Sequence, residues 1–131
     1  MSKTLIITEK PSVARDVAGA LPGSFTRGQG YMEGATYVIS WAVGHLLELA
    51  DPERYDDRFK RWRIEDLPIL PEPFKLVTRR GGGDQLKAIK GQLKRPEIAR
   101  VINACDAGRE GELIFAWIMQ HARNRKPVER L

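Results

Sequence analysis

Apolar residues form two short runs, one near each end of the chain, and both runs predict buried strands. The first run is Leu5–Ile7 and the second is Val101–Cys105. After each run, the apolar positions change to a spacing of three to four residues, which is typical of an amphipathic helix. The helical positions are Val13, Val17 and Leu21 after the first strand, and Leu113, Ile114, Trp117 and Ile118 after the second.

Proline and glycine mark the boundaries of the elements between these runs. Pro11 suits the first turn of a helix, where its missing N–H costs nothing, and Pro22 followed by Gly23 ends that helix. Residues 31–40 predict a β-hairpin that turns at Glu33 and Gly34.

Residues 51–77 contain several prolines and no regular period, so they predict a long ordered loop. Loops of this length are uncommon in compact domains and are usually functional or docked against a neighbour. We expect its apolar side chains to hold it in place, namely Trp62, Leu67, Ile69, Leu70 and Phe74. Asp84 is expected to cap the next helix, whose inner face carries Leu86, Ile89 and Leu93.

The alternation of strands and helices predicts an α/β sandwich. We expect a mostly parallel central sheet of about four strands, flanked by helices. Residues 1–131 are long enough to form one domain with a core of its own.

Acidic residues follow both predicted strands. Glu9 comes after the first strand, and Asp106, Glu110 and Glu112 come after the last. Ligands of open parallel sheets gather at the carboxyl ends of the strands, so these side chains are expected to meet there. Carboxylates in one pocket repel each other unless a cation joins them, and a hard divalent ion prefers oxygen ligands. The sequence therefore predicts Mg²⁺ beside a phosphate.

Composition narrows the class of protein further. The 131 residues include 22 basic and 17 acidic side chains, giving a net charge of +5, which permits contact with nucleic acid without requiring it. Cys105 is the only cysteine, so no internal disulfide forms, and its position predicts a small buried filler in a reducing compartment. No apolar stretch reaches the length of a membrane span, and no signal peptide is recognisable, so we expect a cytoplasmic protein without a membrane partner.

Four sequence blocks occur in an order that resembles a known family. They are Thr8–Ser12, Trp41–Leu46, Leu67–Pro71 and Asp106–Glu112. Together they are similar to the N-terminal Toprim domain of the bacterial type IA DNA topoisomerases, most of all the topoisomerase III group. The resemblance covers essentially the whole chain and implies a Rossmann-like Toprim fold.

The resemblance implies a role for each acidic residue. Glu9 would exchange a proton with the 3′ oxygen of DNA as a strand is cut and rejoined, and Lys10 would approach the scissile phosphate. Asp106, Glu110 and Glu112, with Glu9, would hold Mg²⁺. The general Toprim motif has a second aspartate where this chain has Gly108, and the loss of that ligand favours one metal ion over two.

Two further residues have both a structural and a functional interpretation. Arg109 either balances the acidic motif or contacts a phosphate of DNA. His45 is a candidate at the edge of the DNA-binding face, although a structural histidine is the commoner outcome. The glycines at 81–83 lack the Lys and Ser/Thr of a phosphate-binding P-loop, so no nucleotide cofactor is expected.

The family cuts one DNA strand, holds its end as a 5′-phosphotyrosine, passes DNA through the break and rejoins it. By resemblance, the tyrosine belongs to a domain outside this chain, so the chain alone is expected to be an inactive fragment. Its expected partners are single-stranded DNA and the remaining domains of its parent. The alternatives are a Toprim nuclease or primase-related phosphotransfer domain, and a non-catalytic nucleic-acid-binding module.

Overall fold

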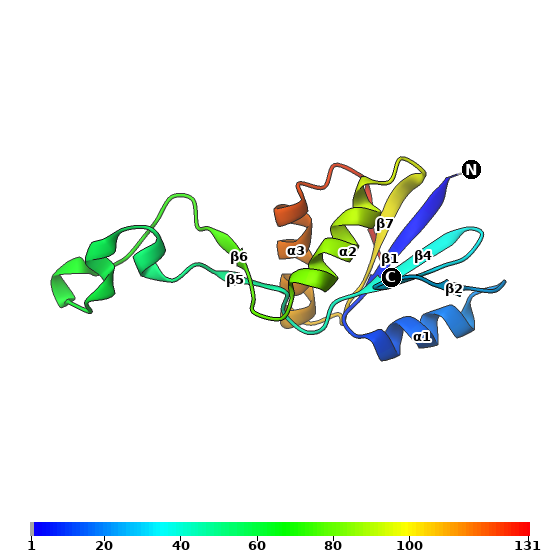
Figure 1. The fold of residues 1–131 in the computed structure, drawn as a ribbon, viewed down its shortest axis with the longest axis horizontal. Helices are drawn as coiled ribbons and strands as arrows, with labels where there is room; N and C mark the ends of the chain where they lie inside the picture. The colour runs from blue at the N-terminus through cyan, green and yellow to red at the C-terminus, as the bar shows by residue number, and fades with distance from the viewer. Residues whose placement is uncertain (1) are drawn as a thin grey trace.

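A six-stranded sheet forms the centre of the structure, a computed structural model that describes residues 2–131 (Figure 1). Its strands are β1 (Lys3–Thr8), β2 (Thr26–Arg27), β3 (Tyr31–Glu33), β4 (Tyr37–Trp41), β7 (Ile98–Ala104) and β8 (Val128–Arg130). The order across the sheet is β2-β3-β4-β1-β7-β8. The β1, β4, β7 and β8 strands run parallel, while β2 and β3 pair antiparallel to their neighbours.

Within residues 2–131, three α-helices cover the two faces of this sheet, which confirms the predicted α/β sandwich. They are α1 (Pro11–Ala20), α2 (Gly83–Lys94) and α3 (Arg109–Ala122). Helix α1 lies on one face, and α2 and α3 lie on the other (Figure 1). None of the helices within residues 2–131 combines the length and the apolar character that a bilayer span requires.

The alternation of side chains along β1 divides the core between the two faces. Leu5 and Ile7 are fully buried in the larger cluster with residues of α2 and α3, whereas Ile6 packs in the cluster that includes Ala14 of α1. A strand that is buried on both faces needs apolar residues at consecutive positions, because neighbouring side chains point to opposite faces. This explains the uninterrupted apolar run at 5–7.

Most of the predicted boundaries are confirmed, and two expectations are corrected. The hairpin forms as predicted, with Glu33 opposite Val38. The sheet has more strands than the expected four, because edge strands of two or three residues carry no detectable period. Asp84 does not cap α2: the N-cap is Gly82, and no side chain caps the helix. Asp84 instead lies in the first turn, where its charge still complements the helix dipole.

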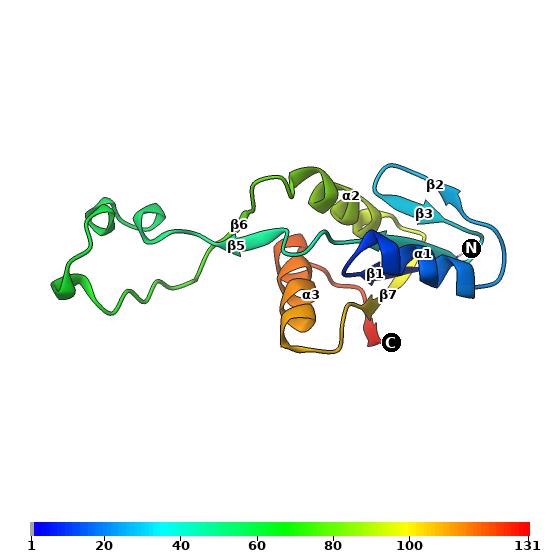
Figure 2. The same cartoon turned by 90° about the horizontal axis from the view of Figure 1, so that it is seen from below.

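A second, two-stranded sheet carries a long segment away from the body of the protein. It pairs β5 (Leu47–Leu49) with β6 (Leu76–Thr78) in antiparallel fashion. The residues between these strands, 50–75, form a projection that we call the arm (Figures 1 and 2). The arm contains three short 3-10 helices, at Pro52–Arg54, Asp57–Lys60 and Ile64–Asp66.

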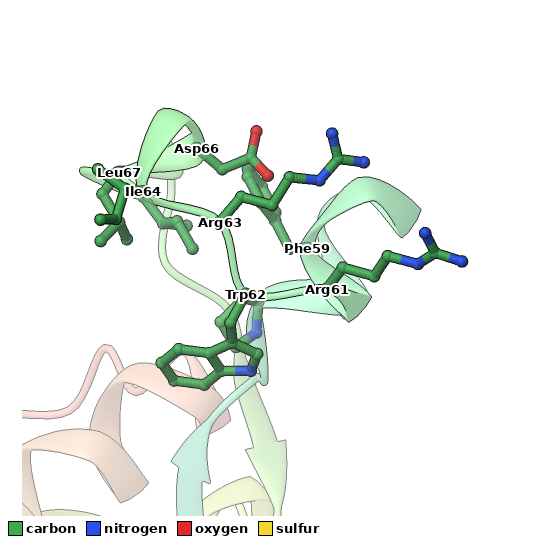
Figure 3. A pocket seen from close by; sticks show the side chains of 9 residues that line it. Phe59, Arg61, Trp62, Arg63, Ile64, Asp66 and Leu67 are labelled. Carbon is green, nitrogen blue, oxygen red and sulfur yellow. The ribbon is translucent and has the colours of Figure 1, made fainter.

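The expectation that apolar side chains hold the segment 51–77 against the domain is wrong. The exposed fractions are 92% for Trp62, 57% for Leu67, 72% for Leu70 and 50% for Phe74, and only Ile69 of the expected set is half-buried. The physical reason is the direction of the β5–β6 ribbon, which leads the segment away from the sheet. Figure 3 shows Trp62, Ile64 and Leu67 around a pocket of the arm.

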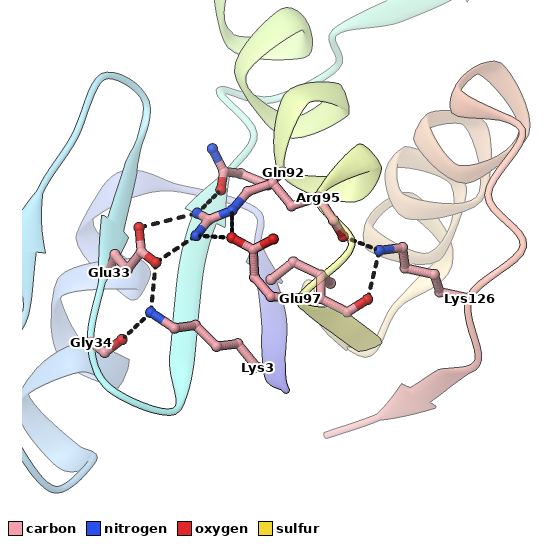
Figure 4. A network of polar contacts seen from close by, with 8 residues as sticks. Lys3, Glu33, Gly34, Gln92, Arg95, Glu97 and Lys126 are labelled. Atoms are coloured by element: carbon pink, nitrogen blue, oxygen red, sulfur yellow. Dashed lines mark hydrogen bonds and ion pairs between the residues drawn. The ribbon is translucent and has the colours of Figure 1, made fainter. Parts of the chain in front are cut away.

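A polar network ties the structure together at the amino ends of the parallel strands (Figure 4). Glu33 accepts hydrogen bonds from Arg95 at 2.6 Å and from Lys3 at 2.6 Å, and Arg95 also pairs with Glu97 at 2.7 Å. The Arg95 hydrogen bond, followed by that of Lys3, lowers the pKa of Glu33 to about 2. Lys126 donates to the carbonyl oxygens of Arg95 and Ile98. The carboxyl ends of the parallel strands lie at the opposite end of the sheet from this network.

Candidate active site

The two halves of the acidic motif leave the sheet side by side. The β1 and β7 strands are parallel neighbours, and Thr8 pairs in register with Ala104. Glu9 and Asp106 therefore follow these strands at the same end of the sheet, where the parallel strands have their carboxyl ends. The β4 strand flanks β1 on its other side, with Trp41 opposite Thr8, so the residues that follow β4 reach this edge too.

Glu9 carries an unusual carboxylate. Its Oε1 atom is buried and has no hydrogen-bond partner within residues 2–131. An unpaired buried acceptor costs about 1–3 kcal/mol, more where the group is charged. No donor or cation within residues 2–131 therefore compensates this oxygen.

Gly111 makes the close approach of Glu9 to helix α3 possible. A Cβ on Gly111 would lie 2.8 Å from Glu9 Oε1 and 2.9 Å from the backbone nitrogen of Asp106, and closer still to the carbonyl oxygen of Asp106. Any side chain at this position would push Glu9 and Asp106 away from helix α3. The absence of a side chain at Gly111 thus allows the Glu9 carboxylate to pack against the first turn of α3.

The N-terminus of α3 begins directly beside Glu9. Gly108 is the N-cap residue, without a side-chain cap, and its N–H donates to the carbonyl oxygen of Asp106 at 2.8 Å. Free backbone N–H groups and the helix dipole favour an anion at such a terminus. A Cβ on Gly108 would meet no atom within 4 Å, so the missing aspartate of the motif leaves open space.

His45 contacts a glutamate of the acidic motif. Its Nε2 atom lies 2.7 Å from Oε1 of Glu110, which is itself 74% exposed. The imidazole also packs against Trp117 of α3, with ring centroids 6.0 Å apart. The contact joins the loop after β4 to the first turn of α3. Sequence reasoning left His45 as either a structural histidine or a DNA contact and did not identify Glu110 as its partner. The pairing becomes visible once β4, β1 and β7 are known to be neighbours.

Glu112 points to a different set of partners. Its Oε1 lies 3.2 Å from Nη2 of Arg130, and Asn103 donates to the same oxygen at 3.5 Å. Arg130 in turn donates to the carbonyl oxygen of Asn103. Neither Arg130 nor Asn103 was among the predicted site residues, because the strand that carries Arg130 is too short to recognise in the sequence.

The remaining predicted residues, Asp106, Lys10 and Arg109, are exposed at this edge. Within residues 2–131, no group of three or more His, Cys, Asp or Glu side chains is arranged to hold a metal ion. Mg²⁺, however, usually keeps several waters and is bound by one or two carboxylates together with substrate phosphates. The free Glu9 oxygen and the exposed Asp106 carboxylate fit that mode of binding, and the metal assignment stays a prediction.

Cys105 is a buried core residue. It is 3% exposed, and its Sγ atom contacts the carbonyl oxygen of Ile7 at 3.9 Å. Burial, assisted by the charge of Glu9, raises the pKa of its thiol to about 12. The thiol therefore remains neutral and serves as a small core residue, as the sequence suggested.

The parallel strands, the carboxylates at their carboxyl ends and the glycine that admits Glu9 define a class of domain. A family model described as "Toprim domain" matches residues 4–131, and the chain belongs to this family.

Among individual proteins, the chain is 52% identical over 131 residues to DNA topoisomerase 3 of Bacillus subtilis (strain 168). It is 51% identical to DNA topoisomerase 3 of Bacillus cereus (strain ATCC 10987 / NRS 248) and 50% identical to that of Bacillus anthracis. Each match covers 100% of this chain but 18% of the relative. The chain thus spans less than a fifth of the length of these relatives, and the resemblance drawn from the sequence blocks is confirmed.

Proposed function

We propose that this chain is the Toprim part of a cytoplasmic, ATP-independent type IA DNA topoisomerase, an isomerase whose other domains belong to a longer parent chain. In this proposal the 5′-phosphotyrosine forms on a tyrosine outside residues 1–131. The observation that carries the proposal is the buried, unpartnered Glu9 oxygen beside the N-terminus of α3. The identity to proteins named DNA topoisomerase 3 supports it.

Within this proposal, Glu9 exchanges a proton with the 3′ oxygen of the cleaved DNA strand. General acid–base catalysis needs a group within hydrogen-bond reach of the reacting oxygen, and Glu9 Oε1 has no competing internal partner. Lys10 and Arg109 are exposed at the same edge and supply positive charge for the phosphates of a single-stranded segment.

Mg²⁺ is the proposed cofactor, held by Glu9 and Asp106 with Glu110 and Glu112 nearby. When bound, the ion would neutralise phosphate charge as the strand is cut and rejoined. His45 orients Glu110 through their 2.7 Å contact, and Arg130 occupies one oxygen of Glu112 at 3.2 Å. Glu9 and Asp106 are therefore the two ligands with the least competition from other side chains.

The test compares Glu9→Gln with a matched control, Glu48→Gln, in the full-length parent. Glu48 is exposed on β5, so its substitution should leave the rates unchanged. Glu9→Gln should reduce oligonucleotide cleavage and religation by about 100-fold or more, the usual contribution of a general acid or base. Unchanged rates in Glu9→Gln would refute the assigned role.

Metal binding is tested separately, by titrating Mg²⁺ into the 131-residue chain and recording two-dimensional NMR spectra. We expect shifts at Glu9 and Asp106 that are lost in Asp106→Asn. Metal-dependent nicking of plasmid DNA by the chain alone would instead favour the nuclease alternative. DNA binding that is indifferent to Mg²⁺ and to Glu9 would favour a non-catalytic module.

A further inference from the structure

The arm concentrates the exposed apolar surface of this chain. Five large apolar side chains are at least half exposed there, with exposed fractions from 50% to 92%: Trp62, Ile64, Leu67, Leu70 and Phe74. Scattered exposed apolar residues are normal, but their concentration on one projection favours an interaction surface. This surface does not belong to the candidate active site, since the β5–β6 ribbon carries it away from the body (Figure 2).

The arm is preformed, which reduces the entropy cost of binding. Tyr55 Oη accepts a hydrogen bond from the backbone N–H of Lys75 at 2.6 Å, and the Lys75 ammonium lies 5.4 Å from the centre of the Tyr55 ring. These contacts join the two ends of the arm. Asp56 caps the second 3-10 helix by accepting from the N–H of Arg58 at 2.9 Å.

The arm also contains a cavity of about 160 Å³ (Figure 3). Its walls include the apolar side chains of Phe59, Trp62, Leu67 and Ile69. Asp66 lines the same cavity, and its Oδ2 atom is buried without a hydrogen-bond partner within residues 2–131. The cavity therefore suits an apolar side chain accompanied by a hydrogen-bond donor, the combination that a folded protein surface presents.

Charge distinguishes a protein partner from a nucleic acid. The arm has six basic and seven acidic side chains, although the whole chain has a net charge of +5. Some of the basic groups are paired locally, since Arg58 lies 3.8 Å from Asp56 and Lys60 lies 3.5 Å from Asp57. A nucleic-acid interface needs an excess of positive charge toward the phosphates. The arm lacks this excess and presents apolar area.

We propose that the arm docks on the part of the parent chain that lies outside residues 1–131, and so fixes the Toprim domain against its neighbouring domain. This inference rests on the proposed function, which places the chain within a longer topoisomerase. The relatives match all 131 residues, arm included, and the match covers 18% of their length. The arm therefore recurs in proteins with a long remaining chain, which offers an occupant at high effective concentration.

The experiment replaces Trp62 with the photo-crosslinking residue benzoylphenylalanine in the full-length parent. Irradiation should give an adduct within the same chain, to a peptide beyond the 131 residues, identified by mass spectrometry. A covalent dimer would overturn the proposal in favour of a second copy. An adduct to added single-stranded DNA would overturn it in favour of a nucleic-acid surface, and the absence of any adduct would refute docking altogether.

A second measurement separates docking from folding. Trp62→Ser should leave the melting temperature of the 131-residue chain within about 1 °C, because an exposed side chain contributes little to stability. In the parent, the same substitution should lower the melting temperature by several degrees, whereas Arg54→Gln, at an exposed arm position that does not line the cavity, should not. Equal effects in chain and parent would contradict docking.

Failure of docking and failure of the proposed function can be told apart. Loss of plasmid relaxation in Glu9→Gln without an adduct from position 62 would leave the function standing and remove the docking. An intramolecular adduct in a parent that never relaxes DNA would support the docking and refute the proposed function.

Discussion

Replacing Gly111 with alanine is expected to damage both the stability and the candidate site. The new Cβ would lie 2.8 Å from Glu9 Oε1 and 2.9 Å from the backbone nitrogen of Asp106. Real Cβ atoms essentially never lie within 3.0 Å of another heavy atom, because van der Waals repulsion rises steeply at that distance. The Glu9 side chain can withdraw, but the backbone of Asp106 cannot do so without moving the start of α3.

The expected cost follows from two opposing effects. Overpacking a tight contact costs about 1–3 kcal/mol, and the better helix propensity of alanine recovers up to about 1 kcal/mol. The constrained partner here is backbone, so we expect Gly111→Ala to lower the free energy of unfolding by about 2 kcal/mol. For a domain of this size, that corresponds to a fall in melting temperature of about 6–10 °C.

Urea unfolding followed by circular dichroism measures this cost, and Gly91→Ala is the matched control. Gly91, like Gly111, lies in a helix, but Gly91 is exposed and a Cβ there would meet no atom within 4 Å. This control should gain about 0.5–1 kcal/mol from helix propensity alone. If Gly111→Ala were as stable as wild type, or gained stability as Gly91→Ala does, the close packing of Glu9 against α3 would be wrong.

Three further predictions concern the ionic groups. Lowering the pH from about 4.5 to 2 should remove about 1–2 kcal/mol of stability. The reason is that Arg95 lowers the pKa of Glu33 from 4.5 to about 2, and solvent screening reduces the full effect of this shift. Arg95→Met should flatten this pH dependence in urea titrations, and parallel profiles for the variant and the wild type would contradict the role of Arg95. Gly108→Asp should tighten Mg²⁺ binding about tenfold in NMR titrations by adding a carboxylate ligand, and an unchanged affinity would refute that placement. His45→Ala should lower kcat of the parent about tenfold with little change in KM, because Glu110 loses its orienting contact; a change confined to KM would assign His45 to DNA binding instead.

The sequence predicted the part of the fold that rests on local periodicity and on strand order. The buried run at 5–7, the helix after Pro11 and the meeting of the β1 and β7 edges each follow from a pattern with a physical cause. The glycine at 111 lies within the acidic motif, and its missing side chain leaves room for Glu9 and Asp106. The short strands β2 and β8 were not predicted, since two or three residues form a strand only because a neighbouring strand is already present.

The arm and the pairing of His45 depend on tertiary direction, which local patterns do not encode. Trp62 and Leu70 have the composition of core residues, and only the orientation of the β5–β6 ribbon decides that they face outward. His45 and Glu110 are 65 positions apart, and their contact requires β4 and α3 to meet at one edge. The exposure of the arm therefore depends on the direction of the ribbon, and the pairing of His45 depends on the order of the strands.

The two ends of the sheet treat their carboxylates differently, and this contrast supports a functional role for Glu9. Glu33 at the amino end has two cationic partners within 2.6 Å, so its charge is compensated inside the fold. Glu9 at the carboxyl end has a buried oxygen with no partner within residues 2–131, although the chain has 22 basic side chains. A sequence selected for stability alone would pair or remove such a group, because leaving it unpaired costs about 1–3 kcal/mol. A partner from outside the domain, whether metal ion or DNA, would offset that cost only while the site is at work.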